Sequence, residues 1–181
     1  NRLDHVDIYN AADYKLAKRI PLGRVPSHIA FNQDSTQAFI TVQESSDIAA
    51  IDLNTQTLLW RLPIGSLVAG IWMTPDDKHL LIGVMGSDHV AVVDWRKRQI
   101  VKRIVTGKGA HNFMARGDGK HLFVSNRNEN TLSEIDMETL TAGRKYKTPS
   151  GPDDMEVSRD GKQIWLTAPT SDGFWTPREQ R

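Results

Sequence analysis

Short apolar runs separated by polar turn residues follow one another along almost the whole chain. The clearest stretch, 107–136, alternates between loop and strand-like segments. Its second expected strand, His121–Asn126, carries three consecutive apolar residues, and its third, Thr131–Asp136, carries two. Short apolar runs bounded by turn residues are typical of β-strands. The pattern predicts an all-β protein with no helix longer than two turns.

The same pattern recurs every 42 residues. The aspartate of the first tight turn appears as Asp34, Asp76, Asp118 and Asp160. The position that ends the third strand appears as Asn10, Asp52, Asp94 and Asp136. A repeat of about 40 to 45 residues with four strands per unit is typical of a β-propeller. We expect propeller repeats over 3–167, with blade units 23–64, 65–106 and 107–148, a half unit at each end, and an irregular tail over 171–181.

Equivalent positions in the repeat predict which residues are buried. One apolar column contains Phe39, Leu81, Phe123 and Trp165. We expect all four to be buried between blades, because a single blade cannot cover its own faces. The column Lys18, Trp60, Lys102 and Arg144 is mostly charged and is expected on the outermost strand, where charge protects an exposed edge. The aspartates that end the third strands are expected to accept backbone N–H groups of the following turn.

One unit carries a recognisable motif. It combines Asp118-Gly119-Lys120, the run 122–126, Asn130-Thr131-Leu132 and Ile135-Asp136. The chain resembles the YVTN family of β-propeller repeats, which includes YncE-like and surface-layer-like proteins; the haem d1 domain of nitrite reductase is a more distant relative. The resemblance implies a ring of about seven or eight blades and a periplasmic or secreted location. It says little about function, because propellers host unrelated activities.

The number of blades leaves several assemblies open. Three whole units and two half units make about four blades. The chain is expected either to be part of a larger ring or to join a second copy, edge to edge, into an eight-bladed ring. A four-bladed ring would instead require the last half unit to pair with the first. Apolar faces left open at the ends predict self-association.

Composition narrows the function classes. The 23 Lys and Arg against 22 Asp and Glu give a net charge of +1, so neither nucleic acid nor an anionic membrane is an expected partner. The absence of cysteine excludes disulfides, thiolate metal sites and covalent c-type haem attachment within this chain. No apolar run approaches the roughly 18 residues of a membrane span, and no signal peptide is visible. The first residue is Asn, which favours a processed protein or a piece of a longer one.

The candidate binding residues lie in loops expected at one mouth of the propeller channel. They are Arg24, His28, Lys108, His111, Asn112, Arg127, Asp153 and Asp154. These positions differ from unit to unit while the framework repeats, as expected for a binding site carried by a scaffold. No phosphate-binding loop, Gly-x-Ser-x-Gly motif or metal-ligand spacing occurs, so no catalytic or metal residue is predicted.

Two functions follow from this chemistry. The first is a non-enzymatic scaffold that binds a small molecule or a protein at the channel mouth. The second is a cofactor-dependent propeller related to the haem d1 domain. In that case His28 or His111 would be an axial ligand, and Asp153 and Asp154 would join it.

Overall fold

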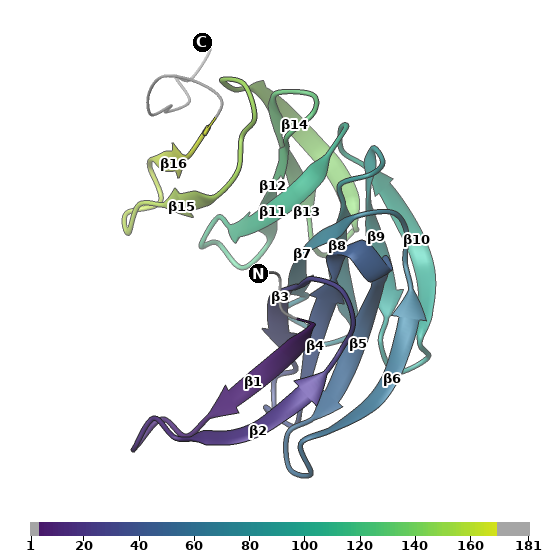
Figure 1. The fold of residues 1–181 in the computed structure, drawn as a ribbon. Coiled ribbons are helices and arrows are strands. Elements are labelled where there is room, and N and C mark those ends of the chain that lie inside the picture. The colour runs from purple at the N-terminus through teal and green to yellow at the C-terminus, as the bar shows by residue number, and fades with distance from the viewer. Residues whose placement is uncertain (1–3, 170–181) are drawn as a thin grey trace.

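The regular secondary structure of the described residues is β-strand apart from one short 3-10 turn. The computed structural model describes residues 4–169 and contains sixteen β-strands (Figure 1). Three sheets have four antiparallel strands each: β3(Pro26–Phe31), β4(Gln37–Val42), β5(Asp47–Asp52) and β6(Thr57–Pro63); β7(Val68–Met73), β8(His79–Val84), β9(His89–Asp94) and β10(Gln99–Val105); β11(Ala110–Ala115), β12(His121–Asn126), β13(Thr131–Asp136) and β14(Thr141–Lys147). Two hairpins flank them: β1(His5–Tyr9) with β2(Leu16–Pro21), and β15(Met155–Val157) with β16(Ile164–Leu166). Within the described range the sole helical segment is the 3-10 turn η1(Gln43–Ser45). The all-β prediction is confirmed.

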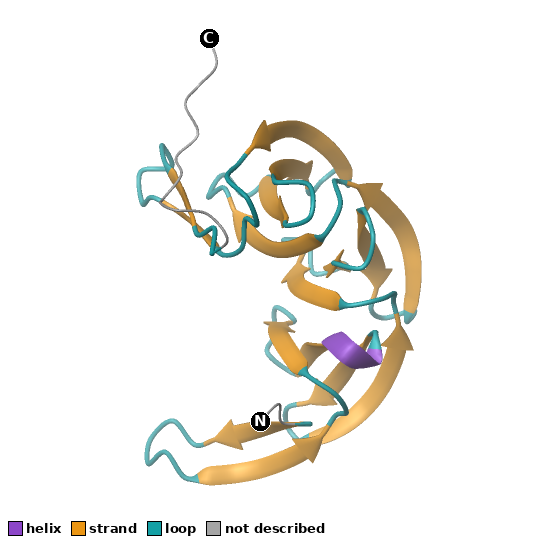
Figure 2. Ribbon diagram, turned by 45° about the horizontal axis from the view of Figure 1, so that its top comes forward, coloured by secondary structure: helices purple, strands orange, loops and turns teal. Residues whose placement is uncertain are grey.

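The five sheets stand side by side around an arc that is open on one side (Figure 2). The inner strands β3, β7, β11 and β15 contact one another in sequence along the arc. The hairpins β1–β2 and β15–β16 lie at opposite ends of it (Figure 1). Among the described strands β1 pairs only with β2, and β16 only with β15. The four-bladed ring, which requires β16 to pair with β1, is therefore not formed.

Strand register follows the 42-residue repeat. The second and third strands begin their pairing at Gln37–Asp52, His79–Asp94 and His121–Asp136 in the three complete blades. At the end of the third strand, Asp136 accepts the backbone N–H groups of Glu138 and Thr139. Asp52 and Asp94 accept one such bond each, from Thr55 and Lys97. These local bonds fix the turns, as the sequence predicted.

The hydrophobic core lies between blades, where each sheet covers its neighbour. Phe39 and Leu81 are fully buried and Phe123 is 4% exposed. Phe123 packs with Met155 and Leu166 of the last hairpin. The prediction for the fourth member of the column, Trp165, is wrong: its side chain is 48% exposed. The reason is positional, because no described blade follows β16 to cover that face.

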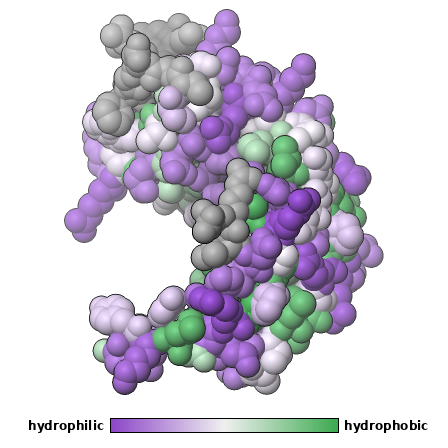
Figure 3. Space-filling model, viewed as in Figure 1, coloured by the Kyte–Doolittle hydropathy of each residue, from purple (hydrophilic) through white to green (hydrophobic). Residues whose placement is uncertain are grey.

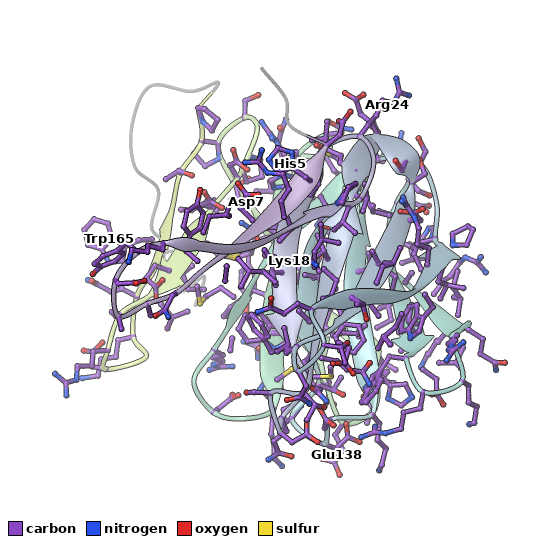
Figure 4. All side chains as sticks on the ribbon, turned by 60° about the horizontal axis from the view of Figure 1, so that its bottom comes forward. His5, Asp7, Lys18, Arg24, Glu138 and Trp165 are labelled. Carbon is purple, nitrogen blue, oxygen red and sulfur yellow. The ribbon has the colours of Figure 1, made fainter. Side chains whose placement is uncertain are left out.

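Charged side chains occupy the outer strands, as predicted. Lys18, Lys102 and Arg144 are exposed on β2, β10 and β14, and Figure 4 labels Lys18 on β2. The face of the molecule seen in Figure 3 mixes hydrophilic and hydrophobic residues. Across residues 4–169 no helix has the length and apolar character needed to cross a membrane. The predicted irregular tail, 171–181, lies outside the described residues.

Candidate binding site at the channel mouth

The site begins with a bulge that each complete blade makes in its inner strand. Pairing with the second strand shifts between Pro26 and Ile29 in the first blade and between Ala110 and Phe113 in the third. The second blade has the same shift. A bulge redirects the side chains next to it. The irregular segments contain Ser27 and His28 in the first blade and His111 and Asn112 in the third.

Hydroxyl groups anchor the backbone at this level. The backbone N–H groups of His28, Asn112 and Asp154 each donate across 3.1 Å to a hydroxyl on the neighbouring second strand or directly after it. The acceptors are Thr41, Ser125 and Thr167. All three acceptors occupy one column of the repeat, so the bond is made by the first, third and fourth units.

The second blade breaks this column with two glycines. Gly83 stands where the other units have a hydroxyl, and Gly70 stands where they have His28, Asn112 and Asp154. A Cβ atom on Gly83 would lie 2.6 Å from the carbonyl oxygen of His111, and one on Gly70 would clash with the same oxygen. The backbone of β11 therefore packs directly against the second blade, which only glycine permits.

This close approach brings together two histidines from blades that are not neighbours. The rings of His28 on β3 and His111 on β11 meet edge to face, with centroids 6.0 Å apart at 87°. Between them the second blade contributes only Ala69 and Gly70 at the equivalent positions. Small residues in the intervening blade leave room for the two imidazoles.

Charged groups complete the cluster. The Nδ1 atom of His111 lies 2.9 Å from Oδ1 of Asp153, and an Arg127 nitrogen lies 3.6 Å from the same oxygen. The contact of His111 with Asp153 is within ion-pair distance but lacks hydrogen-bond geometry, so that buried nitrogen makes no hydrogen bond to a described residue. Asn112 donates from its side chain to Asp154. These contacts join the third blade to the last hairpin.

Burial lowers the pKa of both imidazoles. Loss of water is the largest effect on His28, whose pKa the carboxylates of Asp154 and Asp153 partly restore. The pKa of His111 is also lowered chiefly by burial; Asp153 opposes this effect, and Arg127 and His28 reinforce it. Both rings are therefore neutral near pH 7 and can both donate and accept hydrogen bonds.

Two of the eight predicted residues engage other partners. Arg24 lies 3.8 Å from the carboxylate of Glu44, and the backbone N–H of Lys108 donates to Glu129 across 2.9 Å. Figure 4 places Arg24 at one rim of the molecule and Glu138, in a turn, at the opposite rim. The structure thus brings together His28, His111, Asn112, Arg127, Asp153 and Asp154. That these residues bind a ligand remains a prediction.

The sequence analysis did not select the residues that make the cluster compact. Gly70 and Gly83 allow the close approach, and Thr41, Ser125 and Thr167 hold the backbone. Their signal is visible in the repeat, as a hydroxyl column interrupted by one glycine. The sequence pattern does not show which blades contact each other at this column, so the role of Gly83 could not be predicted from it.

The chemistry of the cluster suits polar binding. In residues 4–169 no group of three or more histidine or acidic side chains is arranged to hold a metal ion. A hollow of about 500 Å³ lies at the opposite rim, lined by turn residues such as Arg116, Asp118, Arg159 and Asp160. Asp118 and Asp160 recur at this turn position in every unit, whereas arginine stands at the positions of Arg116 and Arg159 in those units alone.

Comparisons with known proteins support the fold and leave the ligand open. A family model described as a YncE-like β-propeller matches residues 1–173. A chain of Kuenenia stuttgartiensis hydrazine synthase is similar in structure, with 27% identity and a TM-score of 0.72. The match covers 81% of this chain and 43% of that chain, so the protein spans less than half of the solved chain. No curated protein matches the sequence. In all, 1313 chains of solved structures resemble it, so structural likeness alone does not select an activity.

Proposed function

Because the chain belongs to the YncE-like β-propeller family, we propose that it is a non-enzymatic binding scaffold. Its ligand, a small molecule or a protein segment, would bind at the mouth where His28, His111 and Asp153 meet. A propeller supplies a rigid frame, and its specificity comes from side chains at the ends of its strands.

The observation that carries this proposal is the meeting of His28 and His111 over the second blade. Turn and core positions repeat through the chain, whereas this contact requires two glycines that occur in the second unit only. The cluster offers neutral imidazoles, a guanidinium, carboxylates and an amide. Mixed donors and acceptors that converge on one place are typical of ligand sites.

A ligand-detected NMR screen of a small-molecule library tests the proposal. Hits from the wild-type protein are remeasured on His111→Ala and on the matched control Lys120→Ala, whose position is in a turn at the opposite rim. We expect His111→Ala to weaken binding at least about tenfold and Lys120→Ala to leave it unchanged. The reverse pattern would contradict the proposed site.

A second candidate function is cofactor binding, as in propellers related to the haem d1 domain. The observation that favours it is the pair of imidazoles, His28 and His111, whose ring centroids lie 6.0 Å apart. Burial lowers the pKa of both rings, and the neutral imidazole is the form that ligates metal. The described residues offer single axial ligands only, since no three-ligand cluster exists among them. Titration with haemin, followed by visible absorption, would give a ligation spectrum that His111→Ala abolishes.

The similar solved chain belongs to an enzyme, hydrazine synthase. A propeller within an enzyme can also act as a scaffold for other parts, and the present cluster has no activated nucleophile among its six residues.

We further propose a periplasmic or secreted location, which rests on the resemblance to YVTN-type proteins. Osmotic-shock fractionation of cells that express the full gene would test it.

A further inference from the structure

Three interfaces between successive sheets repeat one buried contact, and the third of them is polar. The contact joins the residue after the outer strand of one sheet to residues on the second and third strands of the next sheet. In the first two interfaces these residues are apolar: Leu22, Val42 and Ala49 in the first, and Ile64, Val84 and Ala91 in the second. In the third interface, between the second and third blades, they are Thr106, Asn126 and Ser133. All nine residues are buried.

A chain of hydrogen bonds runs through the polar interface. The side-chain nitrogen Nδ2 of Asn126 donates to the hydroxyls of Thr131 and Ser133, across 3.0 Å each. Ser133 donates to the backbone carbonyl of Thr106 across 2.9 Å. Because the single hydroxyl proton of Ser133 is used on that carbonyl, Ser133 accepts from Asn126, and the amide nitrogen must face it. The amide oxygen of Asn126 is therefore on the side away from Ser133.

Two buried oxygen atoms of this interface make no hydrogen bond to a described residue. They are Oδ1 of Asn126 and Oγ1 of Thr106. Asn126 is 0% exposed and Thr106 is 1% exposed, so bulk water does not reach them. A buried polar atom without a partner is destabilising, and internal water molecules commonly satisfy such atoms. The first two interfaces avoid this problem with apolar side chains.

We propose that the third interface is a closed binding site for one water molecule. The water would donate to Oδ1 of Asn126 and share a second hydrogen bond with Oγ1 of Thr106. An internal water is held by about two to four polar groups, and these two atoms are otherwise unused. They carry no charge, and a cation such as Ca²⁺ takes about six to eight oxygen ligands, so a water fits this site better than an ion.

The filled network would also position one residue of the proposed ligand site. Asn126 is followed by Arg127, whose guanidinium lies 3.6 Å from Oδ1 of Asp153. The backbone N–H of Arg127 donates to Gly109 across 3.0 Å, two residues before His111. At the position of Arg127 the other two complete blades carry Gln43 and Met85. The polar interface and the guanidinium thus occur in the same unit. This second role rests on the proposed function of the mouth.

Replacing Thr106 by valine tests the water site by the sign of its effect. Valine has nearly the shape of threonine and lacks only the hydroxyl. If Oγ1 binds the water, Thr106→Val should lower the melting temperature, followed by circular dichroism, because a buried hydrogen bond is lost. If no water is bound, the substitution removes an unpartnered hydroxyl and should raise the melting temperature or leave it unchanged. Either of those results would overturn the proposal.

Counting internal waters tests the site directly on the full 181-residue chain. Oxygen-17 relaxation dispersion of the solvent detects long-lived internal waters without interference from proton exchange. Thr106→Ile/Asn126→Val/Ser133→Ala, the triple variant, gives the third interface the residues of the second. It should fold, because whole hydrogen-bonded pairs are replaced by apolar groups, and it should bind one internal water fewer than the wild type.

The control is Thr148→Val, one repeat after Thr106, where the hydroxyl donates to Pro149. It should keep the wild-type number of internal waters. An equal count in the wild type and the triple variant would overturn the water site. If the triple variant does not fold, the same count on Thr106→Val, together with its melting temperature, decides the question.

The positioning role is tested by the titration of His111 in the triple variant, followed by NMR. Burial lowers the pKa of His111 most; Arg127 and His28 lower it further, and Asp153 and Asp154 oppose them. Release of Arg127 from Asp153 should therefore raise the pKa of His111. Ligands found in the screen described above should bind the triple variant about 2- to 30-fold more weakly. An unchanged pKa with unchanged affinity would overturn the positioning role. A screen without ligands would instead contradict the proposed function, and the water count would still decide the water site.

Discussion

The middle blades and the two ends of the arc are built from one repeat but behave differently. Leu81 on β8 is fully buried, and Trp165, at the same place on β16, is 48% exposed. Ile71 and Ile29 show the same contrast at the other end. The repeat assigns each residue a face, and the neighbouring blade decides whether that face is covered. Burial in such a chain is therefore a property of pairs of blades.

The largest expected loss of stability is at Phe123, a buried residue at the position of the repeat that Leu81 and Trp165 also occupy. Phe123→Ala should lower the free energy of unfolding by about 3–5 kcal/mol, because it removes a large aromatic ring from the core between the third blade and the last hairpin. Trp165→Ala should cost less than half as much, because that side chain is 48% exposed. Urea melts of both variants test this, and equal losses would show that Phe123 and Trp165 are covered alike.

The next largest loss of stability is expected where the second and third blades approach each other closely. Gly70→Ala places a methyl group against the carbonyl oxygen of His111, so we expect a loss of about 1–3 kcal/mol from overpacking. Gly143→Ala is the control, because its nearest neighbour would lie 3.7 Å away, at the carbonyl oxygen of Glu134. In thermal melts, Gly70→Ala should lower the melting temperature more than Gly143→Ala does. A neutral Gly70→Ala would mean that the blades are not packed this tightly.

A smaller effect should appear in the pH dependence of stability. Burial lowers the pKa of His28 and His111 below the ordinary value of 6.5. The unfolded chain therefore binds protons first, and stability that is fully present above pH 6.5 is lost as the pH falls through the lower folded values. The double variant His28→Gln/His111→Gln should flatten the stability profile between pH 7 and about 5. An unchanged slope would place the protonation effect elsewhere.

The smallest effect belongs to the turns, which the middle and the ends share. Asp136→Ala removes the acceptor of two backbone N–H groups at a solvent-exposed turn. We expect the melting temperature to fall by no more than about 4 °C. Asn10→Ala, which removes one such bond at the end of the arc, should have a similar effect. A much larger loss for Asp136 would show that turn strength depends on neighbouring blades.

Much of the fold could be predicted from the sequence because the repeat encodes it locally. Strand positions, hairpin register and the turn bonds of Asp52, Asp94 and Asp136 depend on residues close in sequence. The site was less predictable. Six of the eight selected residues come together, while Arg24 and Lys108 engage Glu44 and Glu129. Which loops point at one another depends on the spacing and tilt of blades.

The sequence by itself determined an all-β repeat, its strands and the face on which each side chain lies, since these follow from alternation and from local turn chemistry. Only the tertiary structure decided that His28 meets His111, because that contact spans the second blade and depends on the missing side chains of Gly70 and Gly83. It also decided that Trp165 and Ile29 are exposed while their counterparts are buried. A column in a repeat specifies a direction, and solvent exclusion requires a partner surface that lies in that direction.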